Sequence, residues 1–140
     1  MKQIATRFFA AAAVFALIGM IWGIQMSASH DHTLSPAHGH LNLIGFVAMS
    51  IFGAYYAMTP RAAGSQIANF HFGLTVTTVI VLTPGIVMAI TGQGEILAQI
   101  GSALAVLSMA LFGFVVLRHG VGHPPESNAP EGINRHQPAE

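Results

Sequence analysis

The chain has 140 residues, of which 53% are hydrophobic and only 7% carry a charge. Soluble domains carry about a quarter charged residues, so this composition indicates a membrane protein with little mass outside the bilayer. The chain contains no cysteine, which excludes disulfides, iron–sulfur clusters and thiolate-bound metals, and its net charge of zero gives no sign of nucleic-acid binding.

Four apolar segments are each long enough to cross a hydrocarbon core, which needs about 20 helical residues. They cover residues 8–26, 41–58, 67–90 and 96–117. This pattern predicts an all-α membrane protein, with a four-helix transmembrane bundle in residues 1–118. Residues 119–140, which are rich in glycine, proline and glutamate, are predicted to form a disordered cytoplasmic tail.

The first segment has an alternative interpretation as a cleaved signal peptide. Lys2 and Arg7 precede it, and residues 27–29 are a passable cleavage site. However, its apolar run is longer than the core of a signal peptide, and small residues recur along it at a spacing that suits close helix packing. We therefore expect the segment to be retained as a transmembrane helix.

The distribution of positive charge predicts the orientation in the membrane. Cationic residues precede the first segment, separate the second from the third and follow the fourth, whereas the loops 27–37 and 91–95 contain none. The positive-inside rule then places both termini and the middle loop in the cytoplasm of a bacterial cell, with the histidine-rich loop outside. The residues concerned are Lys2, Arg7, Arg61 and Arg118.

Histidines gather at the outer end of the second segment, where four of the eight lie within residues 30–40. His38 and His40 flank Gly39 at the start of an apolar run, and Asn42 follows; polar groups at this depth are costly in lipid and must find partners. In an α-helix His38 and His40 would lie about 200° apart around the axis, facing two different spaces. Gly39 would let a flat macrocycle or another backbone approach closely.

His30 and His32 admit two interpretations. They are either solvated loop residues or, together with His38, His40 and Asp31, ligands of a copper or zinc ion on the outer face. Neutral imidazoles suit both metals.

His71 lies near the opposite end of the third segment, at the level of Gly53 in the second. That level is about 20 Å below His40 at 1.5 Å per residue, so the two histidines cannot ligate one haem. We expect His71 to be a hydrogen-bonded core residue, or part of a proton or second cofactor site. Tyr55 and Tyr56 fit an interfacial aromatic belt and are left out of the predicted site.

The pattern His38-Gly39-His40 resembles the His-x-His motif in the tenth helix of haem-copper oxidase subunit I. In that family one histidine ligates the high-spin haem and the other the low-spin haem. The longer string within residues 31–43, ending Ala37-His38-Gly39-His40-Leu41-Asn42-Leu43, also resembles short four-helix bacterial membrane proteins labelled as oxidase subunit I-like.

This resemblance implies haem b bound by His38 and His40, with Gly39 and Asn42 beside it. Family members build a ring from three arcs of helices with ligands on the second helix of each arc, which a homotrimer of this chain would imitate. One haem would lie between His38 of one protomer and His40 of its neighbour. The chain lacks the adjacent histidine pair of the family's copper site, and its outer loops lack the arginines that hold haem propionates, so a complete oxidase is not expected.

Three functions stay open at this point. The first is a haem b protein of the inner membrane that transfers electrons or senses a gas or redox state, since bis-histidine iron has no open position for a substrate. The second is a copper- or zinc-binding membrane protein. The third is an interaction protein without a cofactor. The redox partner is not identified by any docking motif.

Overall fold

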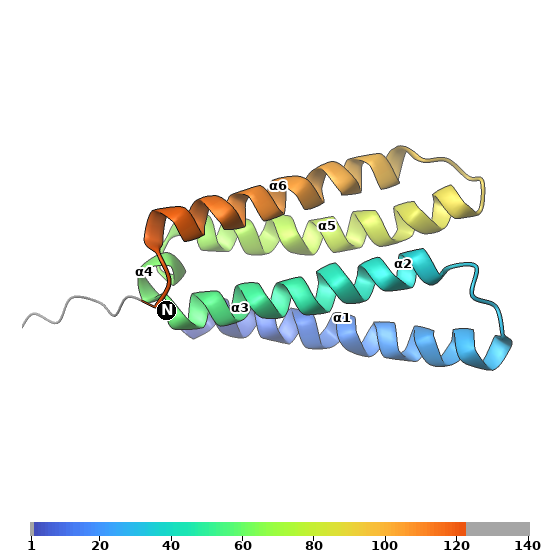
Figure 1. Ribbon diagram of the computed structural model, residues 1–140, viewed down its shortest axis with the longest axis horizontal. Coiled ribbons are helices and arrows are strands. Elements are labelled where there is room, and N and C mark those ends of the chain that lie inside the picture. Colours follow the sequence, from blue (N-terminus) through green and yellow to red (C-terminus); the bar gives the residue numbers. More distant parts are fainter. Residues whose placement is uncertain (1, 123–140) are drawn as a thin grey trace, which may run out of the picture.

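The structure, a computed structural model that describes residues 2–122, consists of helices and connecting turns (Figure 1). Four helices within this range are long and apolar enough to cross a membrane, as predicted. The second of them, Ser35–Met58, is assembled from three consecutive elements. In chain order the elements are α1 (Lys2–Ser29), α2 (Ser35–His40), η1 (Leu41–Ala48), α3 (Met49–Met58), α4 (Pro60–Ala63), α5 (Gln66–Ile90) and α6 (Ile96–His119).

The second membrane helix begins at Ser35, six residues before the expected start at residue 41. Ser, Pro, Gly and His lower the hydropathy of this stretch, but the backbone hydrogen-bond ladder does not depend on hydropathy. Pro36 suits the first turn because the missing N–H would have no partner there. As a result His38 and His40 both project from a formed helix. Beyond them the helix widens into the π-helical turns of η1.

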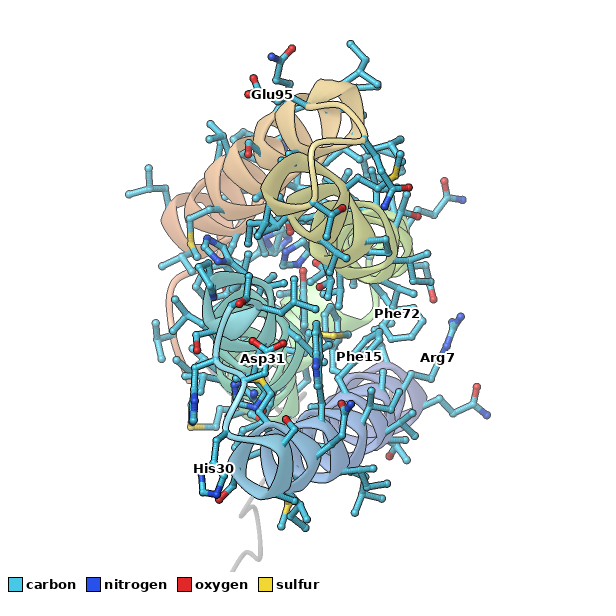
Figure 2. The ribbon with its side chains drawn as sticks, turned by 90° about the vertical axis from the view of Figure 1, so that its right-hand side faces the viewer. Arg7, Phe15, His30, Asp31, Phe72 and Glu95 are labelled. Atoms are coloured by element: carbon cyan, nitrogen blue, oxygen red, sulfur yellow. The ribbon has the colours of Figure 1, made fainter. Side chains whose placement is uncertain are left out.

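The helices pair as two hairpins. α1 packs against η1 and α3, and α5 packs along α6. The second membrane helix lies between α1 and α5, so that α1 and α6 form opposite sides of the molecule (Figures 1 and 2). The loops at residues 30–34 and 91–95 share one end of the bundle, here called the histidine end, and α4 lies at the other, the α4 end.

Glycines allow close contact within each hairpin. A Cβ atom on Gly85 would lie 2.5 Å from the backbone nitrogen of Ala98, and one on Gly101 would lie 2.5 Å from the Cα of Leu82. The backbones of α5 and α6 therefore touch at this crossing. Between α1 and η1, a Cβ on Gly45 would lie 2.9 Å from the Cβ of Phe15. Small residues drive helix packing in membranes because they permit such approach.

Aromatic side chains fill the core near the α4 end. Phe8 is fully buried and packs edge to face against Phe72 and Phe52, at centroid distances of 5.1 and 6.1 Å. Phe8 thereby anchors α1 to both α3 and α5. Arg7 adds a second link, since its guanidinium lies 4.6 Å from the centre of the Phe72 ring and donates a 2.9 Å hydrogen bond to Asn69.

The assignment of Tyr55 and Tyr56 to an interfacial belt is wrong, because only 4% and 1% of their surfaces are exposed. The Tyr55 hydroxyl donates to the carbonyl of Gly120 at 2.8 Å. The end of α6 thereby covers Tyr55, whereas Tyr56 stacks on Phe8 of α1 at a centroid distance of 5.4 Å.

The first residues of the expected tail are part of the bundle. His119 ends α6, and the Gly122 amide donates a 3.3 Å hydrogen bond to the hydroxyl of Thr59. Residues 123–140, which make up the rest of the expected tail, lie outside the described residues.

Candidate functional site

His38 lies in the interface between α2 and α1. Its ring is half-buried, and Nε2 is 2.9 Å from the carbonyl oxygen of Gly19. The ring of Trp22 meets it edge to face at a centroid distance of 6.0 Å. A Cβ on Gly23 would lie 3.2 Å from Nε2, so the small residues of α1 make the space that the imidazole occupies.

Hydrogen bonding around His38 fixes its tautomer. The Gly19 carbonyl can only accept, so Nε2 must carry the proton and donate it. The Asn42 amide nitrogen also lies 3.1 Å from Nε2, but a protonated Nε2 cannot accept from it. Asn42 instead donates to the His38 carbonyl oxygen at 2.9 Å. Asn42 therefore holds the start of η1, and the remaining lone pair of His38 is on Nδ1.

His40 projects from the other side of α2 and is exposed. Its Nδ1 lies 2.7 Å from the carbonyl oxygen of Pro36, one turn earlier, so Nδ1 is the protonated nitrogen. Nε2 then carries a free lone pair on an exposed ring. Metal-bound histidines have this arrangement, in which one nitrogen donates to a backbone carbonyl and the other binds the metal.

Gly39, between the two histidines, is exposed, and a Cβ built on it would meet nothing within 4 Å. Packing among residues 2–122 therefore does not require glycine at this position. The open space beside His40 is available to a ligand or to another molecule.

His30 and His32 are exposed residues at the turn between α1 and α2. His30 has a φ of 57° and points away from the bundle beyond the end of α1, whereas Glu95 lies at the opposite corner (Figure 2). Asp31, which lies between His30 and His32 in the sequence, accepts a 3.0 Å hydrogen bond from the Thr33 amide. The Thr33 hydroxyl, and then its amide, lower the pKa of Asp31 below the ordinary value of 3.8.

The four histidines of the histidine end do not converge on one point in the structure. Among residues 2–122, no group of three or more His, Cys, Asp or Glu side chains is placed to share a metal ion. His38 points into the bundle, His40 points out, and His30 and His32 belong to the turn. A copper or zinc site built from them would need a rearranged turn or a second protomer.

His71 forms a separate polar centre near the α4 end. It is fully buried, and its Nδ1 lies 3.0 Å from the Tyr56 hydroxyl. Its ring lies 4.6 Å from that of Phe52, at the level expected beside Gly53. Its Nε2 has no hydrogen-bond partner among the described residues. His71 is thus a core histidine, as expected, and only its Nδ1 is hydrogen-bonded among these residues.

The partners of His71 are not evident from the sequence. Tyr56 is one of two adjacent tyrosines, and nothing in the local sequence distinguishes the one that contacts His71. A usable signal was the polar spacing on the third membrane helix, where Thr75 and Thr78 follow His71 by one and two turns and are also fully buried. Polar residues at helical spacing in a membrane span mark its inward face.

Comparison with known proteins gives no family for this chain. No protein-family model matches it, no curated protein is detectably similar to it, and no solved structure matches its fold.

Proposed function

We propose that this protein binds haem b between protomers of a homo-oligomer, with His40 as an axial ligand, and that it transfers electrons or senses a redox state or gas in a bacterial inner membrane. The observation that carries the proposal is the arrangement of the two ring nitrogens of His40. Its Nδ1–H is held by the Pro36 carbonyl and its Nε2 is free on an exposed ring near the end of a membrane helix.

The glycine at position 39 favours a flat ligand beside His40. None of the described residues comes within 4 Å of a Cβ built on Gly39, yet the position carries no side chain. A macrocycle that approaches the His40 ring would pass close to Gly39, where any larger side chain would project. The resemblance of His38-Gly39-His40 to the haem-binding His-x-His motif points to the same group.

The second axial ligand has to come from a neighbouring protomer, because the two histidines of one chain face different spaces. His38 is the candidate, and to bind iron through Nε2 it would have to release the Gly19 carbonyl. Closed cyclic assemblies offer such shared sites, and a trimer matches the helix arrangement of the resembling family. Two histidine ligands leave iron six-coordinate, which suits electron transfer more than substrate binding.

Optical spectra test the haem site. We expect the detergent-purified protein, expressed with adequate haem, to give a Soret band and a sharp b-type α band in the reduced-minus-oxidised spectrum. His40→Ala should abolish both bands, and Gly39→Leu should weaken them without affecting the fold. His32→Ala is the matched control, since this exposed histidine lies in the turn and should leave the spectrum unchanged.

A featureless wild-type spectrum, or bands that persist in His40→Ala, would contradict the haem proposal. In that case elemental analysis of the purified protein distinguishes the other two functions. Copper or zinc lost from His40→Ala would indicate the metal-binding function, and a metal-free protein would indicate an interaction protein.

A further inference from the structure

Charged side chains of opposite sign lie at opposite ends of the described bundle. Residues 2–122 contain two acidic residues, Asp31 and Glu95, and both belong to the loops of the histidine end. The arginines of the same range lie at the α4 end, in the second turn of α1, in α4 and in the last turn of α6 (Figure 1). They are Arg7, Arg61 and Arg118. The described part of the α4 end therefore presents positive charge to one membrane surface.

Arg7 lines a surface pocket at this end. The pocket has a volume of about 280 Å³ and lies where the start of α1, the end of α4 and the first turn of α5 meet. Gln3 precedes Arg7 by one turn, so both side chains lie on the same side of α1. The lining residues are Gln3, Ile4, Arg7, Ala63, Gly64 and Asn69.

Neutral partners hold the Arg7 guanidinium in place. It donates a 2.9 Å hydrogen bond to Oδ1 of Asn69 and lies 4.6 Å from the centre of the Phe72 ring. Figure 2 shows Arg7 and Phe72 beside each other at the edge of the bundle. Neither partner carries a negative charge, and the bond to Asn69 occupies only one of the five N–H groups of a guanidinium. The pocket thus contains an oriented cation with donors available to an anion.

We propose that this pocket binds the phosphate group of an anionic phospholipid in the leaflet at the α4 end. Arginine suits phosphate because its planar fork can donate two parallel hydrogen bonds, and the Gln3 amide supplies a neutral donor nearby. Anionic headgroups are concentrated at the membrane surface, where the pocket lies. Val14, two turns deeper on the same side of α1, exposes 55% of its surface and offers an apolar path for an acyl chain.

The contacts of Arg7 also join α1 to α5, and that packing role requires no ligand. The two roles differ in what they need from Asn69. Packing needs an acceptor oxygen, which aspartate also provides, whereas phosphate binding needs a net positive charge, which an aspartate beside the guanidinium would cancel. Asn69→Asp therefore separates the roles. The inference is independent of the haem proposal, because it involves none of the histidines.

Native mass spectrometry of the full chain tests the lipid site. The protein is released from mixed micelles that contain phosphatidylglycerol and phosphatidylcholine with identical acyl chains. We expect wild-type protein to retain phosphatidylglycerol preferentially. Arg7→Gln and Asn69→Asp should each lower this preference about fivefold, which is the contribution of one cationic side chain at an anionic surface.

Arg118→Gln is the matched control, since it removes an equal charge from the last turn of α6, outside the pocket, and should leave the preference in place. The proposal is overturned if wild-type protein retains both lipids equally, or if Arg118→Gln lowers the preference as much as the pocket variants do. Displacement of the lipid by millimolar inorganic phosphate would indicate a site for the free ion and would also overturn it. If Arg7→Gln does not fold, Asn69→Asp decides.

Discussion

The two histidines around Gly39 differ in which nitrogen is free, although they are only two residues apart. His38 donates from Nε2 to another helix, and His40 donates from Nδ1 to its own helix. The first contact makes His38 a packing residue in the described conformation, and the second orients His40 for binding. The sequence contains both imidazoles, but the neighbouring carbonyls decide their roles.

Asp31 provides a test at the scale of a single residue. We expect Thr33→Val to raise the pKa of Asp31 towards its ordinary value, because the Thr33 hydroxyl is the main group that lowers it. Since the folded pKa lies below the unfolded one, the stabilisation of the turn is present above the ordinary carboxyl range and is lost as the pH falls through the lowered pKa. Carboxyl chemical shifts measured against pH give the value directly. An identical titration in wild type and Thr33→Val would refute the assignment.

At the scale of elements, the second membrane helix differs most from its prediction. A hydropathy pattern detects the apolar part and misses the first turns, where Pro36, His38 and His40 are helical but polar. Neither the pattern nor the propensities indicate the π-helical η1. These wider turns lie where the second membrane helix packs against both α1 and α5.

The crossing of α5 and α6 gives a prediction for one element. Gly101→Ala should reduce the free energy of unfolding by about 1–3 kcal/mol, as overpacking does, because the added Cβ meets the backbone of Leu82. Gly113→Ala on the same helix is the matched control, since its Cβ would meet nothing within 4 Å. Denaturant unfolding in detergent measures both variants. Equal stabilities would show that the helices can move apart at this crossing without penalty.

At the scale of the whole molecule, the arrangement as two hairpins leaves broad apolar faces on α1 and α6. Ile21 and Ile24 on α1 and Val106 and Leu117 on α6 are among the most exposed large hydrophobic residues. In a membrane these faces contact lipid or other protomers. The proposed oligomer would use part of them and bring His40 to a partner.

Orientation in the membrane can be tested with single cysteines, because the chain has none of its own. Gln93→Cys lies in the loop between α5 and α6, and Gly64→Cys lies after α4 at the other end; both positions are exposed. The positive-inside rule predicts that an impermeant maleimide added outside the cell labels Gln93→Cys and not Gly64→Cys. Labelling after lysis confirms that both cysteines are reactive. The reverse pattern would mean that the histidine end faces the cytoplasm.

By itself the sequence determined the helical class, the four membrane helices and the opposite facing of His38 and His40. These properties follow from local rules: the length of an apolar run, the backbone hydrogen bonds that lipid requires and the angle between residues in a helix. Such rules act within one segment, so they can be applied without knowing its neighbours.

Only the tertiary structure decided which polar groups meet. The pairing of Tyr56 with His71, the burial of both tyrosines and the contact of His38 with Gly19 each join different membrane helices. Such contacts depend on how the helices rotate and approach one another, which the close packing at glycines fixes. No periodicity within a single helix contains that information.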